Sequence, residues 1–138
     1  LDNLPPGQAT CFHIQLDAPT GWIAYRFADP TPIHIGRPLP ALTLIEHSGS
    51  YDTYFGWYEI TGRVRNDEFT TVDWVSPVGT LYDATGDVVG CAFTYVNEQS
   101  LAGGETGAFE ILYLLRDYAD VADYRIQIDG EIADRRAR

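Results

Sequence analysis

Lysine and methionine are both absent from this chain of 138 residues, so all nine basic residues are arginine. Against them stand 20 aspartate and glutamate residues, which give a formal net charge of -11 at pH 7. An acidic surface repels the phosphates of nucleic acids and the headgroups of anionic lipids, because such ligands are bound mainly through lysine and arginine. The composition therefore argues against nucleic acid as a partner.

Long apolar runs are also absent. A membrane-spanning helix needs about 20 apolar residues, whereas the longest uninterrupted run here, residues 111–115, has the length of a buried strand. We therefore expect no membrane insertion of this chain. Its apolar fraction of 45% is ordinary for a globular protein, and 138 residues suffice for one core with an extension.

No segment shows a sustained helical period, but apolar and polar residues alternate in many short segments. Turn-forming clusters, including residues 48–52, and a loop at 97–104 separate these segments. Pro77 lies inside one of them and indicates an edge position or a bulge. The predicted strands are 42–46, 54–66, 71–82, 88–95, 108–115 and 124–128. Short strands at this spacing predict an all-β fold, an immunoglobulin-like β-sandwich of about seven strands.

The first 40 residues form a separate region. Alternation at 12–16 and 22–27, joined by a turn, predicts an N-terminal β-hairpin extension, and several prolines follow it. We therefore divide the chain into a linker and hairpin at 1–40, a sandwich domain at 41–132 and a charged tail at 133–138.

Residues for catalysis or metal binding are scarce. The histidines His13, His34 and His47 all lie in the first third, and no serine occupies a nucleophile elbow. A zinc site built from the three histidines is the weaker alternative to isolated histidines, because the usual ligand spacing is missing. Cys91 lacks the following histidine and methionine of a blue-copper site. We predict a chain that is not an enzyme, with no metal site and no cofactor.

Acidic residues gather in the predicted loops, and calcium prefers such oxygen ligands. The segment 83–87 lacks the regular spacing of a calcium loop, while Asp83 and Gly86 are typical turn residues. We expect a hairpin turn here rather than a calcium site. Tyr82, which precedes it, and Phe109 are predicted to pack in the core.

Aromatic residues crowd into positions 51–58. In an extended strand, Phe55 and Trp57 would point away from Tyr54 and Tyr58, so that one pair would enter the core. The other pair would face solvent or lie under the N-terminal hairpin. Exposed aromatic rings suit stacking on sugars or docking of a protein. The candidate binding residues are Tyr54, Phe55, Trp57, Tyr58 and Trp22.

The most informative pattern lies between residues 78 and 111. A strand ends in Leu81-Tyr82-Asp83, a turn contains Gly86, and Gly104-Glu105-Thr106 precedes Phe109. These residues resemble the FxLYD family of bacterial envelope domains, whose signature is a strand ending in Phe-x-Leu-Tyr-Asp and a later Gly-Glu-Thr before an aromatic residue. Gly79 stands where the family has phenylalanine. The resemblance covers about two thirds of the chain.

The resemblance implies an extracytoplasmic location, either secreted or associated with the cell envelope, and the family has no assigned activity to carry over. In an oxidising compartment Cys11 and Cys91 would form a disulfide; two small apolar residues that never meet are the alternative. We therefore expect a non-enzymatic binding or interaction module of unknown molecular function, with a protein or glycan partner. A structural spacer or assembly domain and a carbohydrate-binding module are the alternatives. The sequence does not indicate the oligomeric state.

Overall fold

The computed structural model describes residues 38–133 continuously and, before them, Leu4, 7–14, 20–21, 23–24, 26, 28 and 31. The described residues form seven strands and no helix, so none of them forms a helix that could cross a membrane. The strands are β1 (Leu42–Tyr51), β2 (Tyr58–Asn66), β3 (Val72–Asp83), β4 (Val88–Phe93), β5 (Ser100–Leu101), β6 (Thr106–Tyr113) and β7 (Val121–Ile132).

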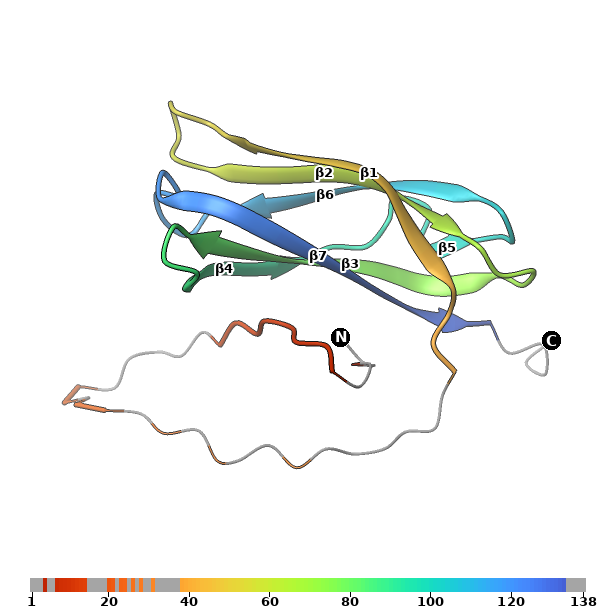
Figure 1. Cartoon of the computed structure of the whole chain (residues 1–138), viewed down its shortest axis with the longest axis horizontal. Helices are drawn as coiled ribbons and strands as arrows, with labels where there is room; N and C mark the ends of the chain where they lie inside the picture. Colours follow the sequence, from red (N-terminus) through yellow and green to blue (C-terminus); the bar gives the residue numbers. More distant parts are fainter. Residues whose placement is uncertain are drawn as a thin grey trace.

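The strands form two antiparallel sheets, as expected for a β-sandwich (Figure 1). The first sheet has the order β1-β2-β6. In the second sheet β3 is central, with β7 along one edge and β4 and β5 along the other. Pro77 therefore does not lie in an edge strand, but a register shift between Asp73 and Ser76 places a bulge just before it.

The core lies between the sheets and follows the two-residue period of the strands. In β6, for example, Phe109, Ile111 and Tyr113 are buried while the residues between them are exposed. Phe109 is thus a core residue as predicted, and Tyr82 is half-buried, with the guanidinium of Arg125 6.0 Å from its ring centre. The other large buried side chains are Ile60, Val64, Val72, Val75, Leu81, Val96, Leu101 and Tyr118.

Gly79 of β3 packs closely against side chains of the first sheet. A Cβ atom added there would overlap the hydroxyl of Tyr113 from β6 and would lie 3.2 Å from Ile111 Cδ1 and 3.3 Å from Ile60 Cδ1. Burial raises the pKa of the Tyr113 hydroxyl. Because Gly79 faces the first sheet, its neighbours Val78 and Thr80 face the opposite way, toward the outer face of the second sheet.

The first hairpin differs from the prediction. Residues 48–51, predicted as a turn, continue β1, and the turn lies at 52–57, where residues 54–57 were predicted as part of a strand. The Asp52 carboxylate accepts hydrogen bonds from the amides of Tyr54 (2.8 Å) and Phe55 (2.9 Å), and Gly56 has φ +73°. Gly49 serves packing rather than turning, since the Tyr58 hydroxyl would lie 2.5 Å from a Cβ there. The two glycines of this hairpin thus have different roles.

The hairpin between β3 and β4 agrees with the prediction. Asp83 Oδ1 accepts hydrogen bonds from the amides of Thr85 (2.9 Å) and Asp87 (3.0 Å) and from the Thr85 hydroxyl (2.7 Å). These bonds, the one from the Thr85 side chain first, lower the pKa of Asp83. Gly86 supplies the positive φ, 90°, that closes the turn. The carboxylate therefore organises the turn itself.

Two further segments depart from the prediction. The loop predicted at 97–104 contains β5, which pairs with Val72 and Asp73 of β3. β7 begins at Val121 and ends at Ile132, and so is longer at both ends than the predicted strand 124–128. The charged tail lies mostly outside the described residues. The strands fall within residues 42–132.

The predicted N-terminal hairpin is not present in the part of the chain that the structure describes. Residues 12–14, 23, 24 and 26 lie in no strand, and the other residues of the two predicted strands, Trp22 among them, lie outside the described residues. An isolated two-stranded hairpin is marginally stable in water, so alternation alone does not ensure that it forms.

Residues 8–11, which we call the strap, instead lie on the outer face of the second sheet (Figure 1, red). At one end Gln127 of β7 donates a hydrogen bond to the Gln8 side chain (3.4 Å), and at the other Cys11 and Cys91 of β4 form a disulfide, with their Cα atoms 5.7 Å apart. Val78 and Thr80 of β3, between these two points, are almost fully buried although they face away from the core.

The excess of acidic residues has a consequence for stability. Three ion pairs, Arg63–Glu46, Arg65–Asp67 and Arg116–Asp120, lie at the surface of the described region, where each contributes little. Mutual repulsion among carboxylates opposes the compact state, and salt screens it. We expect sodium chloride at about 1 M to raise the melting temperature by about 5 °C relative to low salt. Differential scanning calorimetry checks this, and a flat or falling melting temperature would contradict it.

Candidate functional site

Two exposed aromatic surfaces are present on the described part of the protein. The first, which we call the hairpin cluster, consists of Tyr54, Phe55 and Trp57 in the turn between β1 and β2. Phe55 stacks on Trp57, with ring centres 4.6 Å apart, and Tyr54 meets Phe55 edge-on at 4.7 Å. The exposed fraction of the residue is 85% for Tyr54, 56% for Phe55 and 39% for Trp57.

The expectation that these residues alternate between core and solvent was wrong, because they form a turn and not a strand. Tyr58, the first residue of β2, packs against the core, whereas Tyr54, Phe55 and Trp57 are all exposed. Trp22, the fifth predicted binding residue, lies outside the described residues. The structure therefore brings three of the five predicted residues together on the surface.

Hydrogen bonds to the loop between β6 and β7 hold the hairpin cluster in place. The amide of Tyr118 donates to the carbonyl of Gly56 (3.0 Å), and the Tyr51 hydroxyl donates to Asp117 Oδ1 (2.9 Å). Asp117 also accepts from the amide of Ala119, and these two bonds, that from Ala119 first, lower the pKa of Asp117. The turn that carries the cluster is thus held in place by hydrogen bonds, while its aromatic rings project into solvent.

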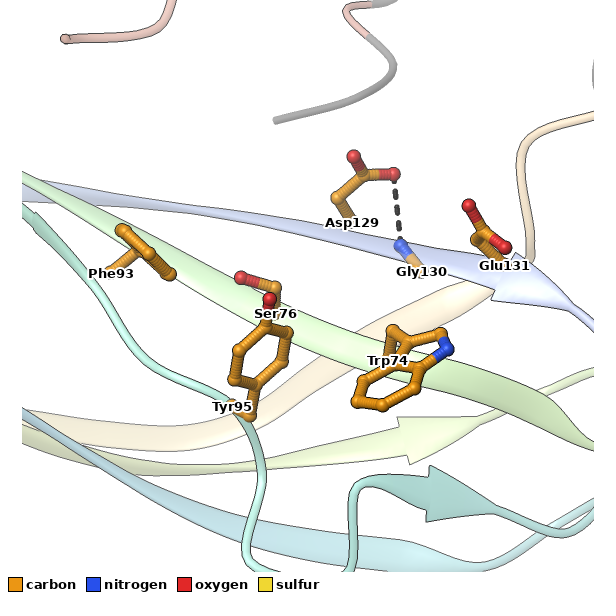
Figure 2. A pocket seen from close by; sticks show the side chains of 7 residues that line it. All are labelled: Trp74, Ser76, Phe93, Tyr95, Asp129, Gly130 and Glu131. Carbon is orange, nitrogen blue, oxygen red and sulfur yellow. Dashed lines mark hydrogen bonds between the residues drawn. The ribbon is translucent and has the colours of Figure 1, made fainter.

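The second surface, the aromatic groove, is a hollow of about 500 Å³ on the second sheet (Figure 2). Tyr95 lies between the two other rings, 6.0 Å from Trp74 and 6.1 Å from Phe93 by ring centres, and meets both edge-on. More than two fifths of each of these side chains is exposed. The lining residues are Trp74 and Ser76 of β3, Phe93 and Tyr95 at the end of β4 and after it, and Asp129, Gly130 and Glu131 of β7.

The position of Trp74 depends on the bulge in β3. Val72 is fully buried, so strict alternation would turn Trp74 into the core as well. The shifted register and a left-handed backbone at Trp74, with φ 54°, instead give the core position to Val75 and leave the indole exposed. A bulge re-aims a side chain in this way. A positive φ at a bulky residue costs about 1–3 kcal/mol, and residues strained in this way cluster at functional sites.

The other wall of the groove is polar. Asp129 and Glu131 are two residues apart on β7, so their side chains lie on the same face. Asp129 is only 7% exposed, and its Oδ1 accepts a hydrogen bond from the amide of Gly130 (2.8 Å). Ser76 donates to the carbonyl of Thr94 (3.0 Å), so its oxygen still has lone pairs to accept a hydrogen bond. None of the seven lining residues is basic.

Sequence reasoning did not single out the residues of this groove. Trp74, Phe93 and Tyr95 were assigned to strands, where aromatic residues are common, and no spacing linked them. The signal that points to the groove is Pro77, which indicated an edge position or a bulge and lies three residues after Trp74. The register shift between Asp73 and Ser76 shows where that bulge lies.

The described residues considered for metal binding do not converge. Among the described residues, no group of three or more His, Cys, Asp or Glu is arranged to hold a metal ion. His47 Nδ1 lies 2.8 Å from the Tyr124 hydroxyl, His13 is exposed, and His34 lies outside the described residues.

Comparisons of the chain with protein-family models, with curated proteins and with solved structures found no match in any of the three. The similarity to FxLYD domains, and the extracytoplasmic location that it implies, therefore stay predictions.

Proposed function

We propose that this chain is a non-enzymatic binding module of an extracytoplasmic protein, built on an immunoglobulin-like sandwich of the FxLYD type. Its ligand binds in the aromatic groove. The observation that supports this assignment best is the exposure of Trp74, since a bulge and a strained backbone turn the indole away from the core and into the groove.

The composition of the groove fits a binding site. Ligand sites are concave and combine aromatic surface with a few polar groups that fix orientation. Tryptophan and tyrosine supply large, rigid contact areas at a low cost in conformational entropy. The groove joins three rings from two neighbouring stretches of chain with two carboxylates from a third.

The main alternative is a structural spacer, for which neither aromatic surface would bind a ligand. The second alternative is a module that binds a protein partner through the hairpin cluster, whose rings project from a turn. Variants of Trp74 and Trp57 separate the three, because each residue belongs to only one of the two surfaces.

We expect Trp74→Gly to abolish binding without loss of stability. Glycine adopts a positive φ at no steric cost, whereas alanine keeps the strain. Trp74→Gly should therefore be more stable than Trp74→Ala by about 1 kcal/mol. Urea denaturation measures this difference, and equal stabilities of the two variants would contradict the left-handed backbone at position 74.

Binding itself is measured by ligand-observed NMR on a mixture of soluble saccharides, amino acids and short peptides. For compounds that bind the wild-type protein, we expect the NMR signals that report binding to disappear with Trp74→Gly and to remain with the matched control Trp57→Ala. The reverse pattern would move the site to the hairpin cluster. An absence of any binding by the wild-type protein would favour the spacer.

A further inference from the structure

We propose that the aromatic groove binds a neutral glycan, with a sugar ring stacked on the indole of Trp74 and sugar hydroxyls donating hydrogen bonds to Asp129 and Glu131. This inference rests on the proposed function, because it names the ligand class of the same groove.

The indole of Trp74 provides a stacking platform. One face of a pyranose ring carries mainly C–H groups, whose slight positive charge is attracted to the negative face of an aromatic ring. Val75, the next residue, is fully buried, so the backbone that carries the indole is anchored in the core. A ring that is already held in place loses little conformational freedom when a ligand binds, which favours affinity.

The polar wall of the groove matches the other side of a sugar. Sugar hydroxyls are hydrogen-bond donors, and a carboxylate has about four acceptor positions. Asp129 and Glu131 are spaced about 7 Å apart along β7, so they reach hydroxyls at different points of one ring or of adjacent rings. The hydroxyls of Ser76 and Tyr95, which also line the groove, add further partners. Donor-rich ligands therefore find acceptors next to the stacking platform.

Charge selects neutral glycans over anionic ones. The described lining residues include two carboxylates and no basic residue, and the whole chain carries a net charge of -11. Uronate or sulfate groups would be repelled at long range by this net charge.

A protein side chain fits the groove less well than a glycan. Protein hot spots are fully desolvated, and removing a carboxylate from water costs several kcal/mol. A glycan replaces that water with its own hydroxyls. An arginine side chain of a peptide is the exception, since it would satisfy both the rings and the carboxylates, so a peptide of this kind is included in the test.

The experiment is native affinity electrophoresis in gels that contain a soluble neutral polysaccharide, namely hydroxyethyl cellulose, xyloglucan, β-1,3-glucan, galactomannan or dextran. We expect at least one of these to retard the wild-type protein, and polygalacturonate not to do so. Trp74→Gly should weaken the retardation at least about tenfold, and Glu131→Gln by about threefold. Trp57→Ala should leave the retardation unchanged.

The inference is overturned if no neutral polysaccharide retards the protein, or if Trp74→Gly is retarded as strongly as wild type. Binding of a short arginine-containing peptide, measured by NMR, tests separately whether the groove is a binding site and whether its ligand is a glycan. If this peptide binds and Trp74→Gly abolishes its binding while every polysaccharide fails, the groove is a binding site and the glycan inference alone falls. If peptide and polysaccharides all fail to bind, both fall.

Discussion

Replacing Gly79 by alanine is expected to lower the free energy of unfolding by about 3 kcal/mol, as overpacking of a tight core does. The added methyl group would overlap the Tyr113 hydroxyl and crowd the side chains of Ile111 and Ile60. β3 cannot retreat from the clash, because β4 and β7 are hydrogen-bonded to its two edges at this position. Urea denaturation of the two proteins at 25 °C measures the difference.

Tyr113→Phe is the matched variant that identifies the clash. The Tyr113 hydroxyl is buried and has no hydrogen-bond partner among the described residues, so its removal alone should be neutral or slightly stabilising. In the Tyr113→Phe background Gly79→Ala should cost at least 1 kcal/mol less than in wild type, a coupling typical of residues in contact. An equal cost in both backgrounds would show that Tyr113 is not the obstacle.

The same pair of residues bears on the predicted resemblance to FxLYD domains. Gly79 stands where these domains have phenylalanine, and the sequence offers no reason for the difference. In the folded chain the space in front of Gly79 is occupied by Tyr113 and by isoleucines of the first sheet. A large side chain at residue 79 is therefore unnecessary for filling the core.

The parts of the fold that follow from local pattern could be predicted from sequence. β6 alternates strictly between buried and exposed residues, and its range of 108–115 was predicted to within two residues at each end. The turn between β3 and β4 was also predicted, because Asp83 and Gly86 form it through contacts within five residues. In both segments local preference and tertiary packing favour the same structure.

The parts that depend on distant contacts could not be predicted. Gly49 lies between two serines, as is typical of a turn, and only the packing of Tyr58 and Tyr124 against it shows that it belongs to a strand. Trp74 faces outward because a bulge gives the core position to Val75 instead. The alternation of apolar and polar residues alone does not locate this bulge. The aromatic groove combines residues from β3, the end of β4 and β7, so no single stretch of sequence contains it.

Replacing Cys11 and Cys91 together by alanine is expected to lower the free energy of unfolding by about 2–4 kcal/mol. The disulfide joins residues 80 apart in sequence, and a crosslink of this span removes many conformations from the unfolded chain. The value should fall below the full chain-entropy figure of about 4.5 kcal/mol, because the freed strap also gains conformational freedom in the folded protein. Urea midpoints of the variant and the wild type measure the loss, and wild type with a reducing agent should match the variant.

The variant should also change the outer face of the second sheet. Without the crosslink the hydrogen bond between Gln8 and Gln127 is the remaining side-chain link between the strap and β7 that the described residues show. Release of the strap would expose Val78 and Thr80, whose amide exchange and side-chain NMR signals should report the change. Phe93, which lines the groove, follows Cys91 by two residues on the same face of β4, so loss of the disulfide should disturb the groove indirectly. The affinity for a ligand in the groove should therefore fall, but by less than with Trp74→Gly. An unchanged urea midpoint together with unchanged signals for Val78 and Thr80 would show that the strap is held without the disulfide.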